Sequence, residues 1–189
     1  KMCNKEWKEI DFNNVTSLTI QKQKKSFLNI KKNDDERYVD DDRRQCKDNF
    51  NNFINSNISI KGKRCSLYDF VKDTLETYSK EEWNIINKQW DNYIEQFNNF
   101  TNIIPLVDVS ASMKDDKCIP LYNAIGLGIA ISQKNDIIFK DRIMTFSANP
   151  SWITLDKEKT FTEKVRKLHY SDWGLNTNFH SALKLILDV

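Results

Sequence analysis

Hydrophobic and polar positions follow two different patterns along this chain, and the pattern changes near residue 100. Over residues 83–97, apolar side chains recur at steps of three and four, the spacing of an amphipathic helix. Directly before them, Ser79 and Glu82 have the identity and spacing of a helix capping box. Residues 1–100 contain one glycine, Gly62, and no proline, so this region is predicted to be mainly helical.

The same signals predict further helices in the first hundred residues. Ser17 is expected to cap one of them, and Phe50 to mark the buried side of another. Acidic triplets at 34–36 and 40–42 lack the glycine and the distal glutamate of an EF-hand calcium loop. We therefore interpret these triplets as solvated positions, mostly on a helix face.

A small basic cluster follows a short extended segment at residues 58–60. The cluster consists of Lys61, Lys63 and Arg64, on both sides of Gly62. A phosphate contact and a solvated turn are both compatible with this composition, and we favour the solvated turn. The aromatic residues of the helix over 83–97 are interpreted as a packed face rather than as a platform for nucleic-acid bases.

From residue 101 onward the pattern predicts a mixed α/β region. The apolar run 103–107 is long enough for one buried strand, and it ends at Asp108. Pro120 stands at a favourable first-turn position for a buried helix over 121–132, in which Gly126 and Gly128 permit close approach to a sheet. The pattern also predicts a second strand, a third, antiparallel edge strand and two helices, at residues 142–146, 151–155, 162–168 and 179–187.

The residues that follow the first predicted strand carry candidate metal ligands. Asp108, Ser110 and Ser112 place one carboxylate and two hydroxyls at alternate positions. Open α/β sheets usually bind ligands at the carboxyl ends of their strands. Oxygen ligands of this kind suit Mg²⁺ or Mn²⁺ better than zinc or copper. The alternative is a serine-rich turn in which Asp108 only caps the next helix.

Composition excludes several classes of protein. The net charge is +2, the balance of 29 basic and 27 acidic residues, so the basic surface expected of a nucleic-acid binder is absent. The four cysteines form no C-x-x-C pair, which makes a zinc site or a disulfide framework improbable on sequence grounds. No apolar run reaches the roughly 20 residues that a membrane span needs. We expect a soluble, intracellular protein, cytoplasmic or virion-borne if it is viral.

The order of these motifs resembles a von Willebrand factor A domain, a Rossmann-like α/β fold. The similarity rests on the strand ending in Asp108, the buried helix, the hairpin at 142–155 and the Gly/Thr loop before the last helix. In that family a divalent cation occupies a metal-ion-dependent adhesion site. The resemblance implies that Ser110 and Ser112 bind Mg²⁺ or Mn²⁺ directly, that Thr177 joins them, and that Asp108 acts through water.

Three segments resemble a narrower, uncharacterised family found in plants, fungi and giant DNA viruses. They are Asp108–Met113, Met144–Trp152 and Trp173–Phe179. Upstream similarity, beginning at Trp7, extends the resemblance over nearly the whole chain, and the richness in Lys, Asn and Ile fits a mimivirus-like source. More distantly, a helical region before such a domain resembles the Ro RNA-binding autoantigen.

Two features depart from the von Willebrand factor A pattern. Ala111 stands where the family commonly has glycine, a mild change. The family's next strand, which carries a further metal-site aspartate, has no counterpart before Val189. By analogy with that family, the three predicted strands would lie in the sheet in the order third, second, first. The strand before Asp108 would then be an edge strand. We expect a C-terminally truncated domain over 101–189, preceded by the helical region 1–100.

Three function classes follow from these expectations. The leading hypothesis is a protein-interaction module whose cation accepts a carboxylate from a protein partner. The second is RNA binding of the Ro type by the helical region, with five candidate contacts: Lys22, Lys24, Lys25, Lys31 and Lys32. The third, an enzyme, is disfavoured because no general base accompanies the predicted metal site, His169 and His180 being the only histidines. Oligomeric state and partner identity are open.

Overall fold

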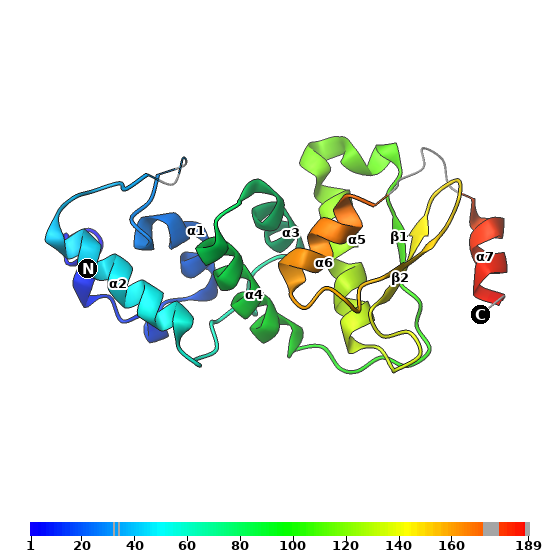
Figure 1. Ribbon diagram of the computed structural model, residues 1–189, viewed down its shortest axis with the longest axis horizontal. Coiled ribbons are helices and arrows are strands. Elements are labelled where there is room, and N and C mark those ends of the chain that lie inside the picture. Colours follow the sequence, from blue (N-terminus) through cyan, green and yellow to red (C-terminus); the bar gives the residue numbers. More distant parts are fainter. Residues whose placement is uncertain (32, 34, 172–177, 188–189) are drawn as a thin grey trace. The chain divides into compact units, whose positions relative to one another are not determined.

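The computed structural model describes residues 1–31, 33, 35–171 and 178–187, and it combines helices with one small sheet (Figure 1). The chain forms two compact units. The first comprises Lys1–Cys65 and Thr77–Gln96, and the second comprises Ser66–Glu76 and Phe97–Val189. The second unit therefore includes a helix from the first hundred residues. The sequence pattern did not predict this arrangement.

The first unit is entirely helical apart from one isolated bridge, as far as it is described. Its elements are two 3-10 turns, η1 (Trp7–Glu9) and η2 (Phe12–Asn14), and the helices α1 (Ser17–Phe27), α2 (Asp41–Asn55) and α4 (Lys80–Ile94). Short polar side chains cap the helices, because each accepts an otherwise unpaired backbone N–H of the first turn. Ser79 caps α4 as predicted, whereas Thr16 rather than Ser17 caps α1.

Aromatic rings form the centre of the first unit. Phe12 contacts Phe27 edge-on, with ring centroids 5.2 Å apart, and Phe50 at 4.7 Å. Rings in such offset and edge-on contacts stabilise a core beyond the area that they bury. On α4, Ile86 and Trp90 are buried, which confirms the interpretation of its apolar stripe as a packed face.

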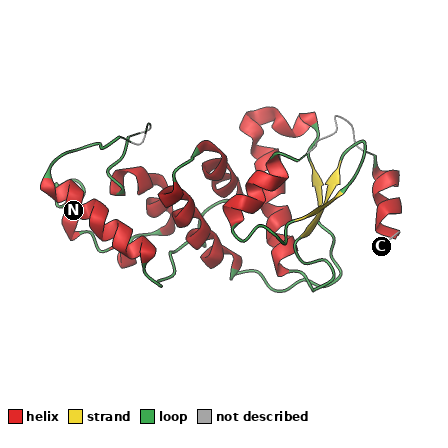
Figure 2. Cartoon of the chain, viewed as in Figure 1, coloured by secondary structure: helices red, strands yellow, loops and turns green. Residues whose placement is uncertain are grey.

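The second unit contains a three-stranded sheet, shown in yellow in Figure 2. Its elements are α3 (Leu67–Glu76), β1 (Leu106–Asp108), η3 (Ala111–Lys114), α5 (Asp115–Lys134), β2 (Arg142–Phe146), β3 (Trp152–Thr154), α6 (Phe161–His169) and α7 (Phe179–Leu187). Strand β1 is parallel to β2, and β3 is antiparallel to β2. The order β1-β2-β3 agrees with the predicted sheet order, and within the described residues β1 lies at the edge.

Strand β1 is shorter and less buried than the sequence predicts. The expected strand over 103–108 reduces to three residues, of which Val107 is buried while Leu106 is partly exposed. Ile103 is exposed as well. None of the helices in the described ranges has the length and apolar character that crossing a membrane requires.

Helix α5 packs against β1 and β2, and α7 contacts β2 from the other side of the sheet (Figure 1). The contact with β1 depends on Gly128, because a Cβ atom there would lie 2.5 Å from Cγ2 of Val107. Two residues earlier, a Cβ on Gly126 would lie 3.1 Å from Cβ of Leu67 and 3.4 Å from the Leu67 carbonyl oxygen. The predicted close approach to the sheet is confirmed for Gly128, whereas Gly126 lies against Leu67 of α3.

Gly128→Ala is expected to destabilise the second unit by up to about 2 kcal/mol. Overpacking lowers the free energy of unfolding by ~1–3 kcal/mol, and the higher helix propensity of alanine raises it by about 1 kcal/mol. The matched control Gly126→Ala gains the same propensity and meets no atom closer than 3.1 Å, so it should destabilise the unit less than Gly128→Ala does. Urea unfolding followed by circular dichroism measures both, and equal midpoints for the two variants would contradict the proposed packing constraint.

Candidate functional site

The candidate metal loop, residues 108–112, begins where β1 ends. Asp108 is the last residue of β1 and pairs in register with Phe146, the last residue of the parallel strand β2. Two parallel strands therefore end side by side at this edge of the sheet, as expected for an α/β ligand site. Ser110 is nearly buried, whereas Ser112 is exposed.

Hydrogen bonds shape the loop. The backbone N–H of Ser110 donates to Oδ1 of Asp108 at 2.8 Å, and the Ser110 and Ser112 hydroxyl oxygens lie 3.1 Å apart. Ser110, not Asp108, precedes the 3-10 turn η3 as its N-cap, so Asp108 does not cap the next helix. The predicted alternative of a capping role for Asp108 is therefore wrong, but a serine-rich turn, here ordered by Asp108, stays an alternative to a metal site.

The donor set fits a small, hard cation. Mg²⁺ binds oxygen at 2.0–2.1 Å in octahedral geometry, which sets neighbouring ligands about 2.9 Å apart. The 3.1 Å separation of the two serine oxygens is close to that spacing. The described residues contain no group of three or more His, Cys, Asp or Glu side chains placed to hold a metal, so a cation here would depend on hydroxyl ligands.

Thr177, the predicted fourth ligand, lies outside the described residues. The residue that follows it in sequence, Asn178, is tied to this edge of the sheet, since its backbone N–H donates to the Ser147 carbonyl at 3.0 Å. Ser147 directly follows β2, and the rings of Phe146 and Phe179 meet edge-on at 6.2 Å. The beginning of α7 is thus held at the strand ends from which the candidate metal loop emerges.

A strained segment follows the candidate metal loop. Asp116, Lys117 and Cys118 all have positive φ, between 47° and 61°, inside the element named α5. Each left-handed residue other than glycine costs about 1 kcal/mol. The regular helix follows at Pro120, close to its predicted start, and it extends to Lys134 rather than ending at residue 132. The chain therefore stores conformational strain directly beside the candidate metal loop.

The thiols and the histidines have environments that do not indicate nucleophilic catalysis. Cys118 donates to the Lys114 carbonyl at 3.5 Å. Burial raises the pKa of the Cys46 thiol to about 11, so that thiol is protonated at neutral pH. Burial, and to a smaller extent the Lys114 ammonium, lowers the pKa of His169. His180 is exposed on the first turn of α7.

The five lysines expected to contact RNA have different environments. Lys25 pairs with Glu82 at 3.2 Å, and Lys24 lies 4.0 Å from the same carboxylate, which is almost fully buried. These two lysines therefore join α1 to α4 and are not freely available to a phosphate backbone. Lys22 and Lys31 are exposed, and Lys32 lies outside the described residues. RNA binding stays a prediction, with fewer accessible contacts than the sequence suggested.

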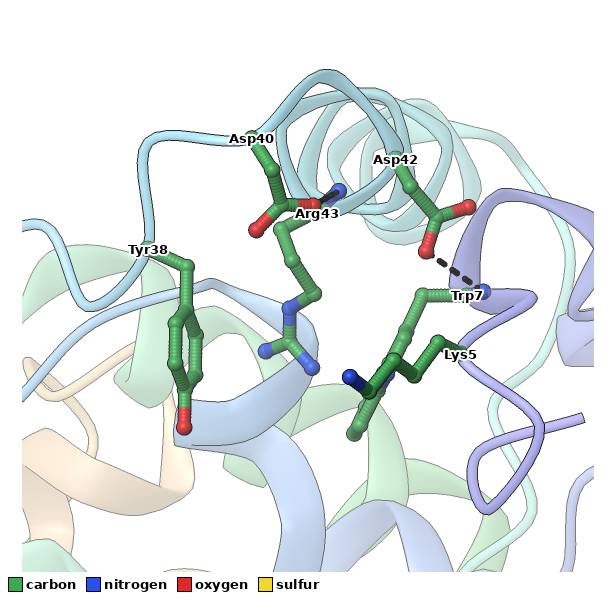
Figure 3. Close-up of a pocket in the computed structure, with 6 residues that line it drawn as sticks. All are labelled: Lys5, Trp7, Tyr38, Asp40, Asp42 and Arg43. Atoms are coloured by element: carbon green, nitrogen blue, oxygen red, sulfur yellow. Dashed lines mark hydrogen bonds between the residues drawn. The ribbon is translucent and has the colours of Figure 1, made fainter.

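A pocket that the sequence did not predict lies at the start of α2 (Figure 3). Its volume is about 520 Å³, and it is lined by Lys5, Trp7, Tyr38, Asp40, Asp42 and Arg43. Figure 3 shows the guanidinium of Arg43 between the two rings, 3.5 Å from the centroid of Trp7 and 5.1 Å from that of Tyr38.

The charged groups of this pocket are largely occupied by the protein itself. Asp42 accepts the backbone N–H groups of Trp7 and Lys8 at 2.9 and 3.0 Å, and Asp40 accepts that of Arg43 at 3.1 Å. Asp40 is exposed, as predicted for residues 40–42, and Asp42 is half-buried, and both carboxylates also accept backbone N–H groups. Burial lowers the pKa of Arg43. Because two carboxylates balance two cations, the pocket presents little net charge, and its contacts indicate a structural role.

Comparison with known proteins adds family information to this geometry. Residues 102–189, which include the candidate metal loop, match the family model described as Domain of unknown function (DUF7788). The chain is also 24% identical over 193 residues to Uncharacterized protein L728 of Acanthamoeba polyphaga mimivirus, an alignment that covers 98% of this chain and 32% of that protein. The chain thus spans about a third of that relative's length. No solved structure matches the chain.

These matches support an uncharacterised family with giant-virus members, as the sequence motifs suggested. Neither match carries information on a metal, an RNA or a protein partner.

Arg43→Lys is expected to lower the free energy of unfolding by about 1–2 kcal/mol, since an ammonium cannot reproduce a planar group stacked between two rings. Arg44→Lys is the matched control: its side chain is 55% exposed and pairs with Glu36 at 2.8 Å. That variant should change stability by less than about 0.5 kcal/mol. Midpoints of urea unfolding compare the two variants. Equal losses of stability would show that the stacking of Arg43 contributes nothing.

Proposed function

We propose that the second unit is a partial von Willebrand factor A-like domain that holds Mg²⁺ or Mn²⁺ at the candidate metal loop and uses the cation to bind a carboxylate of a protein partner. The observation that carries the proposal is the pair of serine oxygens 3.1 Å apart at the end of a parallel strand. The order of the three strands and the buried helix α5 support the domain assignment.

Each residue of the proposed site has a distinct role. Ser110 and Ser112 would supply hydroxyl oxygens to the cation, and Thr177 remains the predicted further ligand. Asp108 already accepts the Ser110 N–H through Oδ1, so it fixes the turn that presents the hydroxyls. Its negative charge lies at the same strand end and favours a cation there.

The choice of a carboxylate follows from the charge of the ligands. Serine and threonine hydroxyls are neutral, so a divalent cation held by them keeps most of its positive charge. Mg²⁺ usually retains exchangeable waters in protein sites, and a carboxylate oxygen is a suitable replacement for one of them. Ser112 and the neighbouring Ala111 are exposed, which leaves this side of the loop accessible to a partner.

A thermal-melting series tests the cation site. Mg²⁺ or Mn²⁺ at a hundredfold excess over its dissociation constant should stabilise the chain by about 2.7 kcal/mol relative to EDTA, because a ligand of the folded state raises the melting midpoint. Ser110→Ala combined with Ser112→Ala should abolish the rise. Thr154→Ala, which removes an exposed hydroxyl on β3, should retain it. A cooperative melt that no cation shifts, or a rise that persists in the double variant, would reject the site.

A second titration separates the carboxylate from the cation. With Mg²⁺ present, acetate should raise the midpoint further than chloride at equal ionic strength, and in EDTA the two salts should act alike. A metal-dependent rise without any acetate effect would retain the cation site and reject carboxylate capture as its use.

A further inference from the structure

A small basic groove lies within the first unit, on the surface formed by the start of α1 and the loop 61–64. Its volume is about 340 Å³, and seven residues line it: Thr16, Ser17, Leu18, Lys61, Lys63, Arg64 and Asn92. Three of these side chains are cationic and none is acidic. The sequence left open a solvated turn and a phosphate contact here; the three basic residues are exposed, and they line one groove with the start of α1.

The three cations of the groove have no acidic partner. In the described part of the chain, no carboxylate forms an ion pair with Lys61, Lys63 or Arg64. Among the described residues, the one hydrogen bond from these side chains is that of Lys61 Nζ, which donates to the Asn13 carbonyl at 2.7 Å. Lys24, Lys25 and Arg44 of the same unit all lie within ion-pair distance of a glutamate. A concave surface with three uncompensated positive charges attracts anions.

The start of α1, which also lines the groove, supplies hydrogen-bond donors. The side chain of Thr16 accepts the Thr19 N–H, which leaves the first-turn N–H groups of Ser17 and Leu18 without an intrahelical acceptor. No carboxylate occupies the first turn of α1. The Ser17 residue is only 5% exposed, yet it lines the groove, and no described residue forms a hydrogen bond with its hydroxyl. A hydroxyl without a protein partner, in a groove that three cations also line, can donate to an anionic acceptor.

Buried contacts hold the two walls of the groove in place. The side-chain amide of Gln89, itself buried, donates to the Ser17 carbonyl at 3.0 Å and to the Lys61 carbonyl at 2.9 Å. Between the cations, Gly62 donates its N–H to Asn92 Oδ1 at 2.9 Å, and a Cβ there would lie 1.8 Å from the Gln89 carbonyl oxygen. The basic loop therefore has a fixed backbone, so little entropy is lost when a ligand binds.

We propose that this groove binds a phosphomonoester group, with the Ser17 hydroxyl and the N–H groups of Ser17 and Leu18 donating to the phosphate oxygens and Lys61, Lys63 and Arg64 neutralising its charge. A phosphomonoester carries nearly two negative charges and three acceptor oxygens at pH 7, which matches three cations and a helix N-terminus. Single-stranded nucleic acid is a poorer match, because no aromatic side chain lines the groove to stack a base.

The test is a titration of the whole 15N-labelled chain, followed by amide resonances. N-acetyl-O-phosphoserine amide serves as the monoester, dimethyl phosphate as a diester of the same group, and an oligouridylate as the nucleic acid. The monoester should shift the resonances of Ser17, Leu18 and residues 61–64 saturably, with an affinity about tenfold above that of the diester.

Three variants separate the groove from general charge. Lys63→Gln combined with Arg64→Gln should weaken monoester binding at least about tenfold, since charge-assisted contacts are lost. Lys22→Gln combined with Lys80→Gln removes the same net charge from exposed positions outside the groove and should leave the affinity unchanged. Ser17→Ala alters no charge and should weaken binding about fivefold, because one donor is lost. A melting curve for each variant confirms that it is folded.

Each remaining outcome would overturn the proposal. Equal shifts with the monoester and the diester, shifts that do not saturate, or unchanged affinity in the folded Lys63/Arg64 variant would show only diffuse attraction of anions. Oligouridylate binding that is tighter than monoester binding at the same resonances would assign the groove to nucleic acid instead. Neither result depends on the candidate metal loop, which lies in the other unit.

Discussion

The second unit depends on the close approach of α5 to β1. Strand β1 has three residues and one neighbouring strand in the described part of the chain, too little pairing to be stable alone. Gly128 lets the helix backbone approach Val107 to a distance at which any Cβ would overlap it. That contact packs α5 on β1, the strand at whose end Asp108 and Ser110 form their turn.

The first unit is held together by a different kind of contact. Its helices enclose an aromatic core, but their positions relative to one another are set by polar side chains from α4. Glu82 is almost fully buried and interacts with two lysines of α1, while Gln89 bridges the start of α1 and the basic loop. Buried polar groups are costly unless they are paired, so these contacts are satisfied in only one arrangement of the helices.

The two candidate sites use different chemistry. The candidate metal loop offers neutral hydroxyls and one carboxylate, which suit a small divalent cation. The basic groove offers cations, a hydroxyl and free N–H groups, which suit an anion. Both are built on turns that buried contacts hold rigid, and both place their donors at the end of a regular element. The pocket beside Arg43 is larger than the basic groove. Its two carboxylates already accept backbone N–H groups of the protein, so few charged groups remain available to a ligand.

The sequence by itself determined those features that depend on neighbouring residues. The cap at Ser79, the buried stripe of α4 and the turn after Asp108 follow from short spacings, because capping, amphipathic packing and a side-chain bond across two residues are local. The sheet order was expected from the family resemblance instead. Only the tertiary structure decided that α3 joins the second unit, that Lys24 and Lys25 meet Glu82, and that Gln89 brings Ser17 beside Lys61. Those partners lie far apart in sequence, and nothing in the local pattern selects them; the packing of whole helices does.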